Sequence, residues 1–155
     1  MTVLAFAADA LGNTTTVSSV SPLPTIAGAG SVGAAGYVNG ATAVMGTSGN
    51  VANAAAVATL AGAVGKTTYI TAIYCNASGS TAGLVVSPTI TGLIGGTLTF
   101  TFVFPVGVLV SGTPLRIEFI PPLPASGLNT AIVCTLPAGG AGTTNATVNA
   151  TGFQV

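Results

Sequence analysis

The side chains that carry most enzyme chemistry are nearly absent from this sequence. It contains no histidine, and only four of its 155 residues are charged: Asp9, Lys66, Arg116 and Glu118. Without histidine, neither a Ser-His-Asp nor a Cys-His arrangement can form, and a common zinc ligand is missing. A glycosidase pair needs two carboxyls about 5 to 9.5 Å apart, whereas Asp9 and Glu118 belong to separate predicted elements. We therefore predict a protein that is not an enzyme, with no catalytic, cofactor-binding or metal-binding residues.

Two glycine-rich stretches resemble nucleotide-binding motifs only superficially. Residues 28–33 approach the GxGxxG pattern, but they lack the hydrophobic strand before it and the helix after it. Residues 62–67 end in Gly-Lys-Thr, but they are two residues shorter than the phosphate-binding loop, and a predicted strand follows them. We expect no nucleotide cofactor.

The remaining reactive or charged side chains favour structural roles. Cys75 and Cys134 both lie in predicted strands, where a free cysteine behaves as a small buried hydrophobe. We favour two free thiols, although the sequence leaves a disulfide open. Arg116 and Glu118 stand two apart on one strand face, which predicts an exposed or interfacial ion pair.

Composition excludes several classes of partner. A net charge of zero argues against nucleic acid and against anionic membranes, because both require clustered Lys and Arg. Mean hydropathy is high at +0.84, but no run of 18 strongly apolar residues occurs, so we expect no transmembrane span. The N-terminus lacks a basic segment, and we expect no secretory signal. Since only 3% of residues are charged, we expect Ser, Thr and Asn to hydrate the surface, or other subunits to cover it.

Residues 97–104 give the clearest strand pattern. Leu98, Phe100, Phe102 and Phe104 alternate with the face formed by Thr97, Thr99, Thr101 and Val103. Alternation with period two predicts one strand with a single face in a core. The opposite face is uncharged and β-branched, which suits a surface covered by another subunit.

Further strands follow from β-branched and aromatic runs bounded by Gly and Pro. We predict a central strand over 67–75 covered on both faces, and a strand over 83–91 that Pro88 places at an edge or bulge. Other strands are expected at 114–120, 129–136 and 143–153, together with 50–60, where a strand is preferred over a helix. Three prolines are expected to end the strand at 114–120; they are Pro121, Pro122 and Pro124. These short strands predict an all-β protein, an antiparallel β-sandwich.

We divide the chain into an extended N-terminal arm, residues 1–49, and a β-sandwich domain, residues 50–155. The arm is rich in Gly, Ala, Ser and Thr and has few bulky apolar side chains. Such a segment cannot offset its ordering entropy alone. It is either a flexible linker or an arm that becomes ordered on a neighbouring subunit, anchored by Phe6 and Tyr37.

Four stretches are similar to one class of protein: residues 65–71, 86–102, 121–132 and 145–153. They resemble small virion structural proteins of tailed bacteriophages, particularly capsid decoration (cement) proteins, over about residues 50–155. The resemblance implies a jelly-roll-like antiparallel β-sandwich, commonly a homotrimer. It also implies a place on the capsid surface of the virion, where the protein bridges neighbouring subunits of the major capsid protein.

Two other functions remain open. One is a head-fibre or tail-fibre module that binds a receptor or carbohydrate, which a glycan array would detect. The other is a coat or pilus-like subunit, which would assemble closed shells or filaments by itself.

Overall fold

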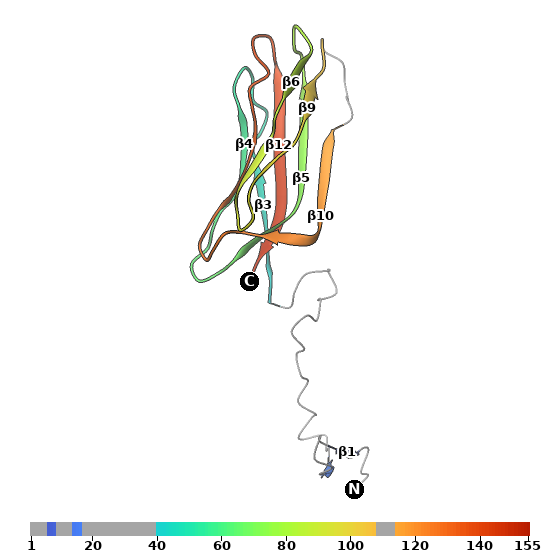
Figure 1. The fold of residues 1–155 in the computed structure, drawn as a ribbon, viewed down its shortest axis with the longest axis vertical. Coiled ribbons are helices and arrows are strands. Elements are labelled where there is room, and N and C mark those ends of the chain that lie inside the picture. Colours follow the sequence, from blue (N-terminus) through green and yellow to red (C-terminus); the bar gives the residue numbers. More distant parts are fainter. Residues whose placement is uncertain (1–5, 9–13, 17–39, 108–113) are drawn as a thin grey trace.

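The computed structural model describes residues 6–8, 14–16, 40–107 and 114–155. In these residues every regular element is a β-strand, and there is no helix. The strands of residues 40–155 form antiparallel sheets that pack into a β-sandwich (Figure 1). This confirms the predicted all-β class.

The first sheet has four strands and contains the longest elements of the chain. Its order is β10 (Leu115–Pro124), β5 (Thr68–Ser78), β12 (Asn145–Gln154) and β3 (Thr42–Thr47). One face of β5 and β12 is buried, and the other carries partly exposed Tyr, Thr and Asn side chains. The prediction that residues 67–75 form a central strand is therefore confirmed. The prediction that both faces are covered is wrong, because Tyr69, Thr71 and Tyr74 lie on a half-exposed face.

The second sheet faces the first across the core. Its order is β4 (Ala56–Leu60), β11 (Ile132–Leu136), β7 (Thr89–Leu93) and β8 (Gly96–Thr99). A two-stranded ribbon adjoins it in sequence, formed by β6 (Leu84–Val86) and β9 (Phe102–Phe104). β4 confirms the strand expected within residues 50–60.

Strand pairing between residues 40 and 155 is nested. The first strand, β3, pairs with the last, β12, while β4 pairs with β11 and β5 pairs with β10. Innermost is a long interrupted hairpin in which β6 pairs with β9 and β7 pairs with β8. The first half of this segment thus pairs antiparallel with the second half along its length, and successive pairs of strands are divided between the two sheets.

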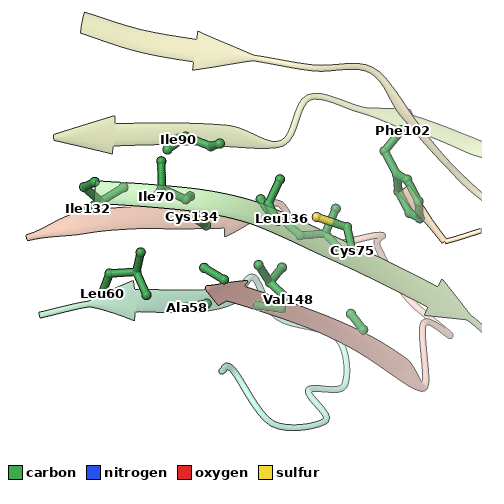
Figure 2. Close-up of a cluster of buried hydrophobic side chains, with 14 of the residues drawn as sticks. Ala58, Leu60, Ile70, Cys75, Ile90, Phe102, Ile132, Cys134, Leu136 and Val148 are labelled. Carbon is green, nitrogen blue, oxygen red and sulfur yellow. The ribbon is translucent and has the colours of Figure 1, made fainter. Parts of the chain in front are cut away.

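The core lies between the two sheets and consists of aliphatic side chains with a few aromatics. Figure 2 shows Ile70, Cys75 and Val148 of the first sheet meeting Ile90, Cys134 and Leu136 of the second; all six are fully buried. Phe102 and Phe104 close one end of this cluster, with ring centroids 5.6 Å apart in an edge-to-face arrangement. Phe102 and Phe104 therefore lie on the inward face that the alternation predicts.

The single strand expected over residues 97–104 is instead two strands in two sheets. Residues 100 and 101 separate β8 from β9, opposite Ser87 and Pro88, which separate β7 from β6. Pro88 has no N–H to donate, and its carbonyl accepts a hydrogen bond from the Phe100 N–H at 2.9 Å. The alternation itself is confirmed, since Phe102 and Phe104 are buried while Thr97, Thr99 and Thr101 are exposed.

The prolines after residue 120 do not end their strand, contrary to expectation. β10 continues to Pro124, and its register against β5 shifts between Glu118 and Leu123. Figure 1 shows β10 turning at this point to cross the lower end of the sandwich. Pairing resumes there between Leu123 and Ile70, so the irregularity accommodates the missing N–H groups.

The domain boundary expected at residue 50 is also wrong, because β3 lies inside the segment assigned to the arm. It pairs with β12 over six positions, from Asn149 opposite Thr47 to Gln154 opposite Thr42. Farther upstream, β1 (Phe6–Ala8) and β2 (Thr14–Thr16) pair with each other. Tyr37 and the side chain of Phe6, the expected anchors, lie outside what the structure describes.

Candidate interaction surface

Metal-ligating side chains are scarce in residues 40–107 and 114–155. This part of the chain has no group of three or more His, Cys, Asp or Glu side chains that could hold a metal ion. It also has no helix long and apolar enough to cross a membrane.

The outer face of the second sheet consists of threonine and valine. In β8, Thr97 and Thr99 point outward while Leu98 packs on the core. The same alternation places two outward β-branched side chains on each of the other strands. We call these eight residues the Thr/Val face: Val57, Thr59, Thr89, Thr91, Thr97, Thr99, Val133 and Thr135.

The strand register aligns these side chains in rows across the sheet. Val57 lies opposite Thr135, Thr135 opposite Thr89, and Thr89 opposite Thr99. The next row brings Thr59, Val133 and Thr91 together. Directly opposite side chains on one face of a sheet are in contact range, so the rows form a continuous surface of methyl and hydroxyl groups.

A pair of valines extends this surface along the β6–β9 ribbon. Val85 lies opposite Val103, and their side chains are 63% and 57% exposed. Their inward neighbours Val86, Phe102 and Phe104 are buried. Val85 and Val103 thus add two exposed apolar side chains next to the uncharged Thr/Val face.

The described charged side chains lie away from the Thr/Val face. Arg116 and Glu118 point outward from β10 in the first sheet and form an ion pair, as the sequence predicts. The guanidinium of Arg116 lies 5.5 Å from the ring centroid of Tyr74. The hydrogen bond from Arg116 to Glu118 raises the pKa of Arg116 above its ordinary value. Lys66, on the loop before β5, donates a hydrogen bond to the Thr42 hydroxyl at 2.9 Å.

Beside this ion pair the first sheet is hollowed. The irregular part of β10 leaves a depression of about 410 Å³ against the outer face of β5 and β12. Tyr74, Glu118 and Ile120 contribute to its lining, together with Thr71 and Thr151. It brings an aromatic ring, a carboxylate and two hydroxyls to one place.

The cysteines play no part in either surface. Both thiols are free and fully buried between the sheets, which confirms the preference for unpaired cysteines (Figure 2). Burial raises the pKa of Cys75 to about 11. Burial and the nearby Cys75 raise that of Cys134 to about 12. Both remain thiols at neutral pH, and a protonated thiol is a poor nucleophile and metal ligand.

Sequence reasoning identified only part of the Thr/Val face. It singled out the threonines of residues 97–101 and Val103, all of which are exposed. It missed the contributions of β4, β7 and β11. The signal was present as alternation, since Val57 and Thr59 flank Ala58, and Val133 and Thr135 flank Cys134. Only the strand order places these pairs beside β8.

Comparisons of the chain with protein-family models, with curated proteins and with solved structures found no match.

Proposed function

We propose that this chain is a non-enzymatic virion structural protein, a capsid decoration (cement) protein that bridges neighbouring capsid subunits. The observation that carries the proposal is the Thr/Val face. Interface cores are depleted in charged side chains, and this face has none in a sheet that a core holds rigid. The proposed partner is the major capsid protein, and the proposed location is the capsid surface of the virion.

The strand topology supports the proposal. If the interrupted hairpin is counted as two strands, eight strands pair as first with last, second with seventh, third with sixth, and fourth with fifth. This nesting is the pattern expected of a jelly roll, and we propose that fold here. Viral capsid proteins and lectins are among the proteins that use it.

The low charge supports the same interpretation. A protein with 3% charged residues has little electrostatic means of remaining dispersed, and burial against a shell removes that need. We propose that copies associate as homotrimers and that the chain before β3 is an extended arm that contacts neighbouring capsid subunits. Phosphate binding is not part of the proposal, because two cations cannot neutralise a nucleic acid backbone.

The test is the occupancy of this protein on purified virions, measured by quantitative gel electrophoresis and by electron microscopy of the particles. Wild-type protein is expected at a fixed, high copy number. Thr99→Lys places a charge in the Thr/Val face and is expected to weaken attachment roughly tenfold or more, because an unpaired charge would be desolvated. Asn76→Lys is the matched control, since Asn76 is exposed on the outer face of the other sheet.

The outcomes separate two claims. Absence of the protein from purified virions would overturn the decoration role itself. Normal occupancy of the Thr99→Lys protein would retain a virion role but would remove the Thr/Val face as the attachment surface.

A second function, a fibre module that binds carbohydrate, draws support from the hollow on the first sheet. Tyr74 and Glu118 there provide an aromatic ring and a carboxylate, groups that can contact the apolar face and the hydroxyls of a sugar. A glycan array with wild-type and Tyr74→Ala proteins tests this alternative. Consistent binding that Tyr74→Ala abolishes would favour it over the decoration role.

A further inference from the structure

The free edge of β10 combines an open row of backbone groups with charges of both signs. β10 pairs with β5 along one edge, and on its opposite edge the Pro124 carbonyl accepts a hydrogen bond from the Ile94 N–H at 3.2 Å. Residues 115–120 of that opposite edge have no strand partner in the described chain. The side chains that point toward the core from this strand, Leu115, Ile117 and Phe119, are only partly buried. An unpaired edge with incompletely covered apolar side chains is a template for another strand.

The sequence of this edge is self-complementary. In an antiparallel pair centred on Ile117, position 116 of one copy lies opposite position 118 of the other. Arg116 of each copy would then face Glu118 of its partner on the outer face of the sheet, where both side chains already point. Opposite charges placed directly across an antiparallel pair stabilise it.

The apolar side chains fit the same register. Leu115 would lie opposite the second copy's Phe119, and Ile117 opposite its own counterpart, so that the half-buried inner row is covered. Pro114 would meet Ile120, whose side chain is 89% exposed in the single chain. Pro114 and Pro121 bound the segment, and every residue between them has an N–H group to donate.

We propose that β10 is a contact between two copies of this chain, in which two β10 strands pair antiparallel about a two-fold axis at Ile117. The two first sheets then become one continuous sheet, and the two Arg116–Glu118 ion pairs merge into a square of four alternating charges. We favour a second copy of this chain as the partner of β10, because the charges and the strand register of two β10 strands match each other and no further molecule is needed. The contact is separate from the Thr/Val face and is compatible with a proposed trimer, since a two-fold contact can also join two trimers.

Charge reversal tests the register directly. Arg116→Glu and Glu118→Arg each create like charges at both cross-strand positions, and each is expected to raise the dissociation constant for self-association about tenfold or more. The double substitution Arg116→Glu with Glu118→Arg restores opposite charges and is expected to associate like the wild type. Sedimentation velocity over a concentration series measures all four proteins.

Mixing the two single variants provides the sharper measurement. A Glu-Glu chain and an Arg-Arg chain are complementary only to each other in this register, so native mass spectrometry should find assemblies with equal numbers of the two. The ion pair within each chain is not restored by mixing, so recovery reports the contact between copies alone. Lys66→Glu is the control with the same change in charge as Arg116→Glu, and it is expected to associate normally.

Three results would overturn the proposal. One is wild-type protein that shows no self-association up to its highest soluble concentration. Another is an assembly whose dissociation constant is the same in the wild type and in both single variants. The third is a mixture of the single variants in which mixed assemblies do not form, with both proteins shown to be folded by their circular dichroism spectra.

Discussion

The backbones of Gly46 in β3 and Thr59 in β4 touch where the edges of the two sheets meet. A methyl group placed on Gly46 would stand 2.5 Å from the backbone carbonyl oxygen of Thr59. β3 and β4 are the edge strands of their sheets on this side. Because Gly46 has no side chain, β3 and β4 can approach closely and close this side of the sandwich. On the other side, the outer edge of β10 has no strand partner over residues 115–120 in the described chain.

Substitution of Gly46 by alanine is expected to destabilise the fold. The neighbour is backbone and cannot move without disturbing β4, so overpacking should lower the free energy of unfolding by about 1 to 3 kcal/mol. Gly95→Ala is the control, because no heavy atom lies within 4 Å of a methyl group there. Urea denaturation of the two variants measures the difference, and equal stability of both would contradict the close contact.

Two truncations should separate the upstream segment from the sandwich. Removal of residues 1–39 retains every strand from β3 to β12. Removal of residues 1–49 also deletes β3 and exposes the edge of β12. The free energy of unfolding of native proteins is about 5 to 15 kcal/mol. We expect the longer truncation to lose a large part of this free energy and the shorter one to lose much less. Thermal unfolding compares them; equal losses would show that β3 contributes little.

The buried thiols predict a fall in stability at alkaline pH. Folding raises the pKa values of Cys75 and Cys134 to about 11 and about 12 from the ordinary thiol value of 9.0. The unfolded chain therefore releases these protons first, and the free energy of unfolding should decrease as pH rises from about 9 to about 11. The stabilisation is fully present below pH 9.

The cysteine prediction is checked by urea midpoints measured across this pH range. The Cys75→Ala and Cys134→Ala double variant is the reference, and its midpoint should fall less steeply than that of the wild type. A thiol reagent at pH 8 should react with neither cysteine in the native protein and with both after denaturation. Rapid reaction of the native protein would contradict the burial.

Two threonine-to-valine substitutions should change stability in opposite directions. Among the described residues, Thr143 is fully buried and its Oγ1 has no hydrogen-bond partner. Thr71 Oγ1 donates to the Thr151 carbonyl oxygen at 3.0 Å. Thr143→Val should raise the free energy of unfolding by about 1 kcal/mol, and Thr71→Val should lower it by about 0.5 to 1.5 kcal/mol. Paired urea titrations measure both, and a loss in both variants would indicate that Thr143 is bonded in solution.

Side-chain alternation made most of the fold predictable, because it depends only on the geometry of a strand. The buried faces of Phe102–Phe104 and Ile132–Leu136 and the half-buried face of Leu115–Phe119 all follow from it. Strand ends were predicted less well where proline was involved. Pro88 divides a hairpin that alternation alone reads as continuous, whereas the prolines after Ile120 are absorbed by a register shift.

The Thr/Val face was predictable only in part because it is assembled from strands distant in sequence. Thr99 could be recognised as exposed and uncharged from its own strand. That Thr89, Thr135 and Val57 stand beside it depends on strand order, which a pattern within one strand does not encode. β3 was missed for a related reason: its Gly and Ala residues resemble a linker until β12 pairs with it.

Nested pairing has a consequence for how this protein is made. The Val148 N–H bonds to the Ser48 hydroxyl across 100 positions of sequence, and β3 has no strand partner until β12 exists. Contacts this distant slow folding, because a long loop must close before they can form. On the ribosome, the first sheet cannot be completed until nearly all of the sequence printed here has emerged. Nascent chains therefore keep unpaired strand edges for most of their synthesis. Pairing between the strands of two unfinished copies is favoured most during this stage, when those copies are crowded together.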